Sequence, residues 1–131
     1  MEYRLLLDNE IRELESRILF EDNHLLILNK RVGEITQGDK TGDECLSEKL
    51  KAYIAYRDNK AGKVFMGVAH RLDRPVSGVC IFAKTSKALE RLNEMFRTSQ
   101  IHKTYWALCE SHPPKDEGEL DNYIWKNEKQ N

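Results

Sequence analysis

The most informative stretch of this chain is a turn followed by an apolar run. It reads His70-Arg71-Leu72-Asp73-Arg74-Pro75-Val76-Ser77-Gly78 and continues into the run Val79–Ala83. The proline and the Ser-Gly pair indicate a turn, and the short apolar run after it predicts a buried strand. The stretch also places the carboxylate of Asp73 between two arginines. Nearby positive charge favours an ionised carboxylate, which can act as a nucleophile or a base. The alternative is a solvated charge cluster beside a turn.

The segments on either side of this run show helical and strand patterns. Upstream we expect a helix over Asp8–Arg17 capped by Asp8, strands over Arg17–Phe20 and Leu25–Asn29, a glycine-rich loop over Gly33–Gly42, a helix capped by Asp43, and an extended segment over Val64–Leu72. Downstream we expect a helix capped by Thr85 or Ser86 with Ala88, Leu89, Leu92, Met95 and Phe96 inward, and a strand over Lys103–Glu110. Regular β-α-β alternation is absent. The pattern therefore predicts an α+β fold with a mixed, largely antiparallel sheet and flanking helices.

Length and composition indicate one globular domain. The chain has 131 residues, of which 40% are hydrophobic and 33% charged. Its longest aliphatic run, Leu25–Leu28, is far too short for a membrane span, and the N-terminal leucines reach Asp8 too soon for a secretory signal. The three cysteines are widely spaced, and the four histidines lack ligand spacing. We therefore expect reduced thiols, a cytoplasmic protein and no metal site.

Charge is distributed unevenly along the chain. The formal net charge is only −1, but residues 60–106 carry nine basic and three acidic side chains, a net charge of +6. This segment contains Asp73. A local basic surface can bind phosphate whatever the total charge. The alternative is a chance excess of basic side chains spread around the fold.

The sequence around Asp73 resembles the signature of the RluA-like pseudouridine synthases, His-Arg-Leu-Asp, two variable residues, then Thr-Ser-Gly. The resemblance continues through Ala83-Lys84-Thr85 and through His102-Lys103-Thr104-Tyr105-Trp106-Ala107, which is similar to the family's Lys-x-Tyr-x-Ala strand. Upstream, Ile18–Lys30 ends in the family's Asn-Lys motif. Two positions depart from the family pattern: Val76 stands where Thr is frequent, and no proline follows Lys30.

This resemblance implies an RNA pseudouridine synthase that acts on ribosomal or transfer RNA without a cofactor or a metal. It implies Asp73 as the catalytic aspartate and Tyr105 as the active-site tyrosine. The residues expected to bind RNA are Arg71, Arg74, Lys30 and Lys103. We expect His70 to be a structural hydrogen-bonding residue and Ser77 and Gly78 to shape the turn.

The resemblance also divides the chain into an N-terminal extension, residues 1–17, and a catalytic domain, residues 18–131. Family domains continue beyond this length, so we expect the domain to be incomplete at its C-terminus. A sheet edge left unpaired would favour self-association or marginal stability.

Two alternative functions stay open: an inactive RNA-binding fragment or remnant, and an unrelated Asp-dependent hydrolase. The hydrolase is disfavoured because no second carboxylate or metal cluster accompanies Asp73.

Overall fold

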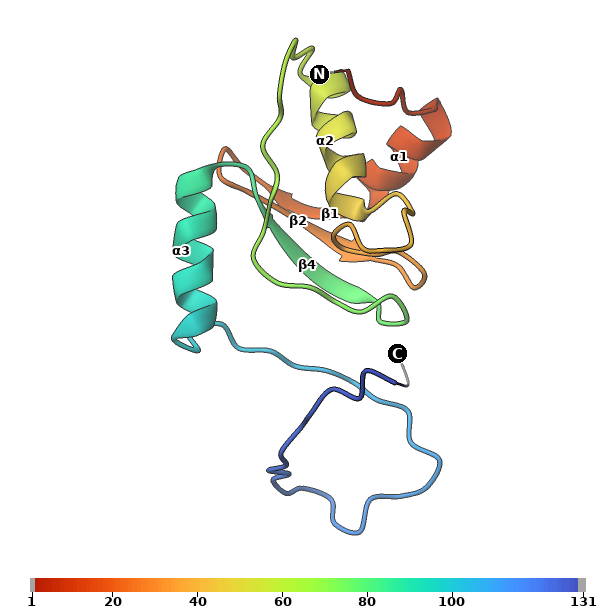
Figure 1. Cartoon of the computed structure of the whole chain (residues 1–131), viewed down its shortest axis with the longest axis vertical. Coiled ribbons are helices and arrows are strands. Elements are labelled where there is room, and N and C mark those ends of the chain that lie inside the picture. The colour runs from red at the N-terminus through yellow and green to blue at the C-terminus, as the bar shows by residue number, and fades with distance from the viewer. Residues whose placement is uncertain (1, 130–131) are drawn as a thin grey trace.

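The apolar run after the turn forms the strand β4 (Gly78–Ala83), which lies inside a four-stranded sheet (Figure 1). We describe residues 2–129 of a computed structural model of the chain. β4 pairs on one edge with β2 (Leu25–Lys30), which pairs with β1 (Ile18–Glu21), and on the other edge with the short β3 (Gly67–Val68). The order is β1-β2-β4-β3, and every described pairing is antiparallel. The predicted α+β class is confirmed.

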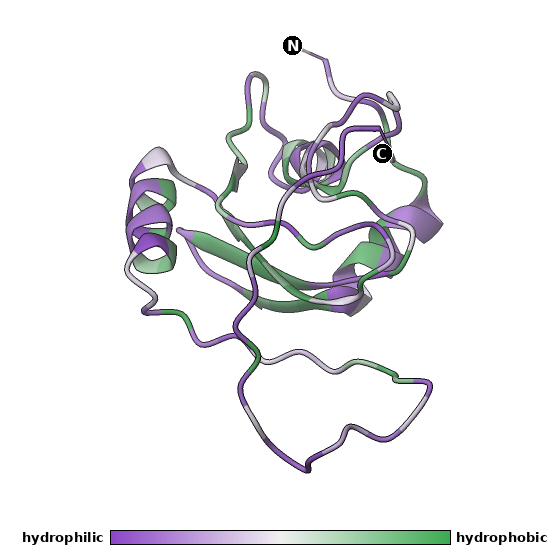
Figure 2. Cartoon of the chain, turned by 60° about the horizontal axis from the view of Figure 1, so that its bottom comes forward, coloured by the Kyte–Doolittle hydropathy of each residue, from purple (hydrophilic) through white to green (hydrophobic). Residues whose placement is uncertain are grey.

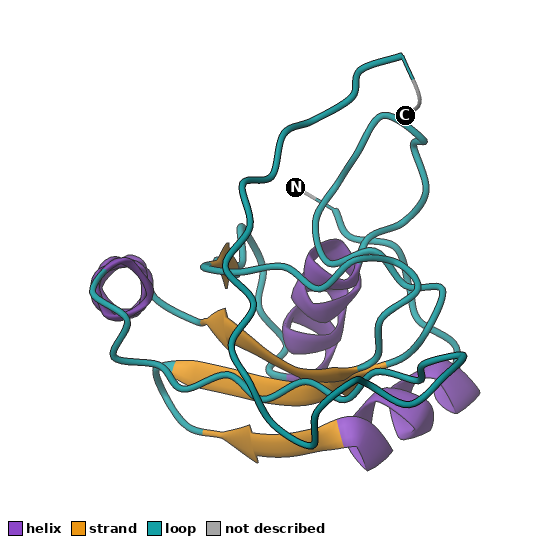
Figure 3. Cartoon of the chain, turned by 90° about the horizontal axis from the view of Figure 1, so that it is seen from below, coloured by secondary structure: helices purple, strands orange, loops and turns teal. Residues whose placement is uncertain are grey.

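Two helices, α1 (Asp8–Arg17) and α2 (Leu46–Arg57), lie on the same side of the strands (Figure 1) and share one core with them. Figure 3 shows α2 over the strands and α1 leading into the end of β1. Alternate strand residues point to this face, because successive side chains of a strand lie on opposite sides. The side chains that meet there with no exposed surface are Leu26, Leu28, Cys80 and Phe82 from the strands, with Leu14 and Leu50 from the helices. This cluster is the main core and supports β2 and β4 from behind.

The third helix, α3 (Ser86–Arg97), lies beside the sheet, and its apolar side is turned towards the strands (Figure 2). The predicted cap is confirmed, since the Thr85 hydroxyl accepts a hydrogen bond from the Ala88 N–H at 3.1 Å. Ala88 and Leu92 are buried, as expected. The inward orientation predicted for Met95 is wrong: its side chain is 38% exposed.

Residues 2–17 form part of the main core. Leu6 and Leu14 are buried in it, and the Tyr3 hydroxyl accepts a hydrogen bond from the Val64 N–H at 2.7 Å. The expected boundary at residue 18 therefore does not separate two packing units. Helix α1 begins at Asp8, but its cap is Leu7, whose N–H donates to the Glu10 carboxylate at 2.8 Å.

Two other predicted boundaries differ from the structure. Helix α2 begins at Leu46 with Cys45 as its cap, and the N–H groups of Leu46 and Ser47 donate to the Ile35 and Thr36 carbonyls. The predicted cap, Asp43, pairs with Arg74 at 2.9 Å. Of the extended segment predicted over Val64–Leu72, only Gly67–Val68 joins the sheet.

The strand predicted over Lys103–Glu110 is wrong. Residues 101–129 form an irregular, open loop below the sheet (Figure 1), and almost all of their side chains are exposed. An alternating pattern becomes a strand only when its backbone finds a partner. The Ile81 N–H of β4, which lies beside this segment, donates to His70 at 2.9 Å and is therefore not available to pair with a further strand. None of the helices within residues 2–129 combines the length and apolar character needed to cross a membrane.

Candidate active site

Asp73 lies in the loop between β3 and β4, at the start of a turn that the Val76 N–H closes by donating to the Asp73 carbonyl at 2.9 Å. Leu72, directly before it, is buried and anchors the loop, whereas Asp73 itself is exposed. Within residues 2–129, the Asp73 carboxylate has no hydrogen bond or ion pair. The carboxylate is therefore available to a ligand.

Lys30, at the end of β2, holds this loop from inside the protein. Its side chain has no exposed surface, and its ammonium donates to the carbonyls of Val76 at 2.6 Å, Arg31 and Asp73 at 3.1 Å, and Arg74 at 3.4 Å. Burial lowers the pKa of Lys30. The expected RNA contact of Lys30 is not compatible with this position, because every donor of the ammonium already faces a carbonyl. Lys30 instead fixes the backbone that carries Asp73.

The two arginines next to Asp73 do not pair with it. Arg74 lies against the loop before α2, 2.9 Å from Asp43 and 4.0 Å from Asp39. Arg71 is exposed, and among the described residues it has no hydrogen bond or ion pair. Because an exposed ion pair such as that of Arg74 is weak, both guanidinium groups can exchange their present surroundings for a phosphate.

His70 joins the loop to β4 and α3, and its expected structural role is confirmed. Its Nε2 atom accepts a hydrogen bond from the Ile81 N–H at 2.9 Å, and its ring stacks on Phe96 with centroids 4.8 Å apart. Burial lowers the pKa of His70, and the charge of Lys103 lowers it further. The neutral imidazole is the form that can accept this hydrogen bond.

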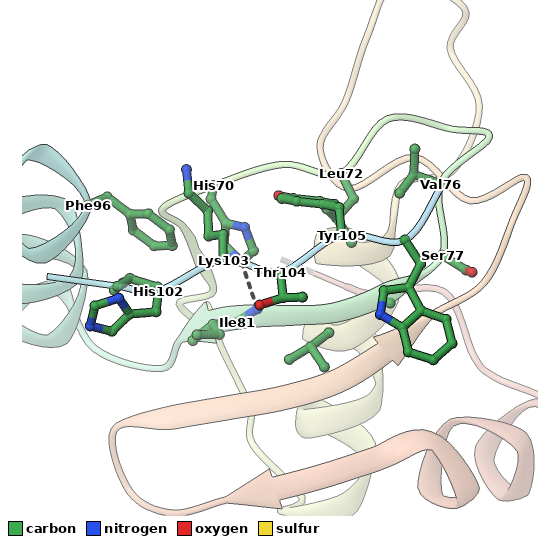
Figure 4. A pocket seen from close by; sticks show the side chains of 14 residues that line it. His70, Leu72, Val76, Ser77, Ile81, Phe96, His102, Lys103, Thr104 and Tyr105 are labelled. Carbon is green, nitrogen blue, oxygen red and sulfur yellow. Dashed lines mark hydrogen bonds between the residues drawn. The ribbon is translucent and has the colours of Figure 1, made fainter. Parts of the chain in front are cut away.

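A cavity of about 670 Å³ lies over β4, beside the loop that carries Asp73 (Figure 4). One side is formed by His70, Leu72, residues 76–79 and Ile81, and the other by residues 101–106, which include Lys103 and Tyr105. Tyr105 is 62% exposed. The Lys103 ammonium lies 6.0 Å from the centre of the Phe96 ring. The cavity thus brings Tyr105 and Lys103 together with Val76 and the turn, while Asp73 is not among its lining residues.

Some features of this site were not predicted from the sequence. Phe96 was expected to face a core, yet it lines the cavity and stacks on His70. The burial of the Lys30 side chain was also not predicted, although its position at the end of the apolar strand Leu25–Lys30 is a signal that points to it. Within residues 2–129, no three His, Cys, Asp or Glu side chains are grouped as metal ligands.

Comparisons with known proteins agree with this geometry. The family described as RNA pseudouridylate synthase matches residues 24–131. The chain therefore belongs to the RNA pseudouridylate synthase family.

Named relatives refine this membership. The chain is 34% identical over 118 residues to the Xenopus tropicalis protein "Pseudouridylate synthase RPUSD4, mitochondrial", covering 90% of this chain and 36% of that protein. It is 37% identical over 100 residues to the Vibrio parahaemolyticus protein "Ribosomal large subunit pseudouridine synthase C", covering 76% of this chain and 30% of that protein. These relatives confirm the resemblance to the RluA-like enzymes.

One solved structure, "Human RNA Pseudouridylate Synthase Domain Containing 4", matches with a TM-score of 0.58 and 26% sequence identity. The match covers 69% of this chain and 33% of the human one. The chain thus spans about a third of the length of the relatives that it matches.

Proposed function

We propose that the protein isomerises uridine to pseudouridine in ribosomal or transfer RNA, with Asp73 as its essential carboxylate. One observation supports this above all. In a chain of this family, the exposed Asp73 carboxylate has no partner within residues 2–129, while four carbonyls around it are tied to the buried Lys30 ammonium. An unpaired carboxylate on a residue whose backbone is held in place by hydrogen bonds is suited to act on a bound substrate.

The proposed reaction breaks the N1–C1′ bond of the uridine, turns the base and joins C5 to C1′. The base gains a proton at N1 and loses one from C5, so the reaction needs no redox partner and no outside atom, and we propose no cofactor. Asp73 either attacks the C1′ carbon or takes a proton from the sugar. Both routes require an ionised carboxylate within reach of the sugar.

Tyr105 is the proposed partner of Asp73 in the site. Its ring is exposed in the cavity, where an extruded base can stack on an aromatic face. Its hydroxyl is proposed to assist the removal of the C5 proton. Lys103, in the same segment, is proposed to contact a phosphate.

Arg71 and Arg74 are proposed to bind the RNA backbone or to fill the gap left by the target base. A uridine must leave its stack to reach a side chain such as Asp73. The unpaired state of Arg71 among the described residues supports this role, and Arg74 would exchange its contact with Asp43 for a phosphate.

We further propose that residues 18–131 belong to the catalytic domain and that the protein works in the cytoplasm. Cys45, Cys80 and Cys109 are all free thiols, which supports a reducing compartment.

The test is tritium release from RNA labelled at uridine C5, compared for the wild type, Asp73→Asn and the control Asp116→Asn. We expect Asp73→Asn to abolish release while RNA affinity stays within a few-fold, because binding is spread over several basic side chains. The assay should be run on this chain and on any longer form that the gene encodes. Turnover by Asp73→Asn would overturn the assignment, and RNA binding without turnover in every form would favour an RNA-binding remnant.

A further inference from the structure

Thr36, in the loop after β2, contacts the residue that precedes Asp73. Its side chain is buried, and its hydroxyl donates to the Leu72 carbonyl at 3.1 Å and accepts from the Leu72 N–H at 3.3 Å. One hydroxyl thus satisfies both backbone polar groups of Leu72. Thr36 is itself held from the other side, because its carbonyl accepts a hydrogen bond from the Ser47 N–H of α2 at 3.2 Å.

This contact completes the restraint on Asp73. On its C-terminal side, the Asp73 carbonyl accepts from the Lys30 ammonium at 3.1 Å and from the Val76 N–H at 2.9 Å. On its N-terminal side, Thr36 holds the Leu72 peptide groups. The backbone is therefore fixed on both sides of a residue whose carboxylate is free within the described chain, so the direction of that carboxylate depends on these two restraints.

Removal of the Thr36 hydroxyl would leave the N–H and the carbonyl of Leu72 buried without a partner. Buried polar groups that lose their hydrogen bonds are costly, so the loop would shift until they reach water or another partner. A shift of this kind would move Asp73, because the two residues share a peptide bond. Small displacements of a reacting group can reduce a rate by about 100-fold.

We propose that Thr36 is a positioning residue that aims the Asp73 carboxylate at the substrate. The proposal rests on the proposed function, since it assigns to Thr36 a role in the reaction of Asp73. It predicts that the hydroxyl affects turnover more than RNA binding, because Thr36 is buried and Asp73 supplies chemistry.

The test uses Thr36→Val, which removes the hydroxyl at nearly constant shape, and Thr36→Ser, which keeps it. The control is Thr98→Val, which removes an exposed hydroxyl bonded to the Glu94 carbonyl at the end of α3. For each protein, kcat and KM come from tritium release, RNA affinity from titration, and the protection of the Leu72 amide from hydrogen exchange. We expect Thr36→Val to lower kcat by roughly 10- to 100-fold, to change KM and RNA affinity by less than about threefold, and to speed exchange at Leu72.

Thr36→Ser should restore kcat to within about threefold of the wild type, and Thr98→Val should match the wild type. The inference is overturned if Thr36→Val keeps the wild-type kcat, or if it raises KM in place of lowering kcat. Should Thr36→Val fail to fold, Thr36→Ser decides: a tenfold loss of kcat in that variant also overturns the inference. If the wild type shows no turnover, either as this chain or as any longer form that the gene encodes, while Thr36→Val still speeds exchange at Leu72, the proposed function fails and the contact between Thr36 and Leu72 stands.

Discussion

At the scale of single residues, the most unusual feature of the protein is the complete burial of the Lys30 side chain. A lysine is almost never fully buried without a partner, and this one has no exposed surface. Its partners are neutral carbonyls of the loop 73–76 and of Arg31. The desolvation of the ammonium opposes folding, as its lowered pKa reflects, and the hydrogen bonds to the loop offset that cost.

Replacement of Lys30 by methionine should therefore destabilise the protein. The variant keeps about the same side-chain length but removes the ammonium that donates to the Val76 carbonyl, which has no other hydrogen-bond donor among the described residues, at a cost of about 1–3 kcal/mol. Urea unfolding measures the loss, and Lys63→Met, at an exposed lysine, is the control. We also expect faster hydrogen exchange at Val76. An unfolding free energy equal to that of the wild type would show that the ammonium contributes nothing net.

The identity of Lys30 as a motif residue was readable from the sequence, but its role was not. A charged side chain in a motif predicts a ligand contact by default, because charges normally stay in water. Only the three-dimensional path of the loop 73–76, which turns its carbonyls towards β2, provides the alternative. The same holds for Arg74, whose pairing with Asp43 joins residues 31 positions apart.

At the scale of elements, His70 connects the loop to β4 and to α3. Its imidazole is held neutral because burial and Lys103 lower its pKa. In the unfolded chain a histidine takes up a proton near pH 6.5. Below that pH the unfolded state binds more protons than the folded state, so stability falls as the pH drops through about 6.5 towards the folded pKa.

We expect the melting temperature to decrease between pH 7 and pH 5, before the acidic side chains titrate. His70→Gln keeps an acceptor near the Ile81 N–H but cannot titrate, so its melting temperature should change less over this range. His112→Gln, at an exposed histidine, is the control and should follow the wild type. Identical pH profiles for all three proteins would contradict this account.

Elements with their own buried face were predicted from the sequence, and those that depend on a distant partner were not. The apolar residues of Leu25–Lys30 and Gly78–Ala83 and the cap at Thr85 are local signals, and each led to the correct element. Residues 103–110 show the same alternation as a strand, but no ladder partner lies beside them among the described residues. An alternating pattern shows that a segment is compatible with a β-strand. Whether the strand forms depends on a partner strand from another part of the chain.

At the scale of the whole molecule, the basic segment 60–106 should dominate RNA binding despite a net charge of −1. We expect the affinity to fall steeply with salt, with a log–log slope of about −0.7 for each phosphate neutralised on single-stranded RNA. Arg71→Gln should make this slope shallower by about 0.7, the contribution of one neutralised phosphate. The control is Arg12→Gln in α1, outside the segment. A flat salt dependence would show that the basic side chains do not share one face.

The irregular segment 101–129 exposes an unusual amount of apolar surface. Its most exposed large side chains are Trp106, Leu108, Leu120, Tyr123, Ile124 and Trp125, each at least 78% exposed. Such a surface favours association, so we expect this chain to self-associate and to be catalytically silent alone. Sedimentation velocity should show concentration-dependent oligomers that Leu108→Ser with Ile124→Ser reduces and Leu5→Ser does not. A stable monomer with measurable tritium release would contradict this expectation.

The anchoring of the loop at Lys30 also has a consequence for folding cooperativity. A surface loop normally opens many times for each global unfolding event, because few core contacts hold it. Here the buried ammonium of Lys30, at the end of β2, donates to carbonyls of the loop, and side chains of β2 lie in the main core. The amides around Asp73 should therefore exchange through openings nearly as rare as those of β2 itself. The Asp73 carboxylate would then lose its fixed position only when the whole domain unfolds, in a single transition.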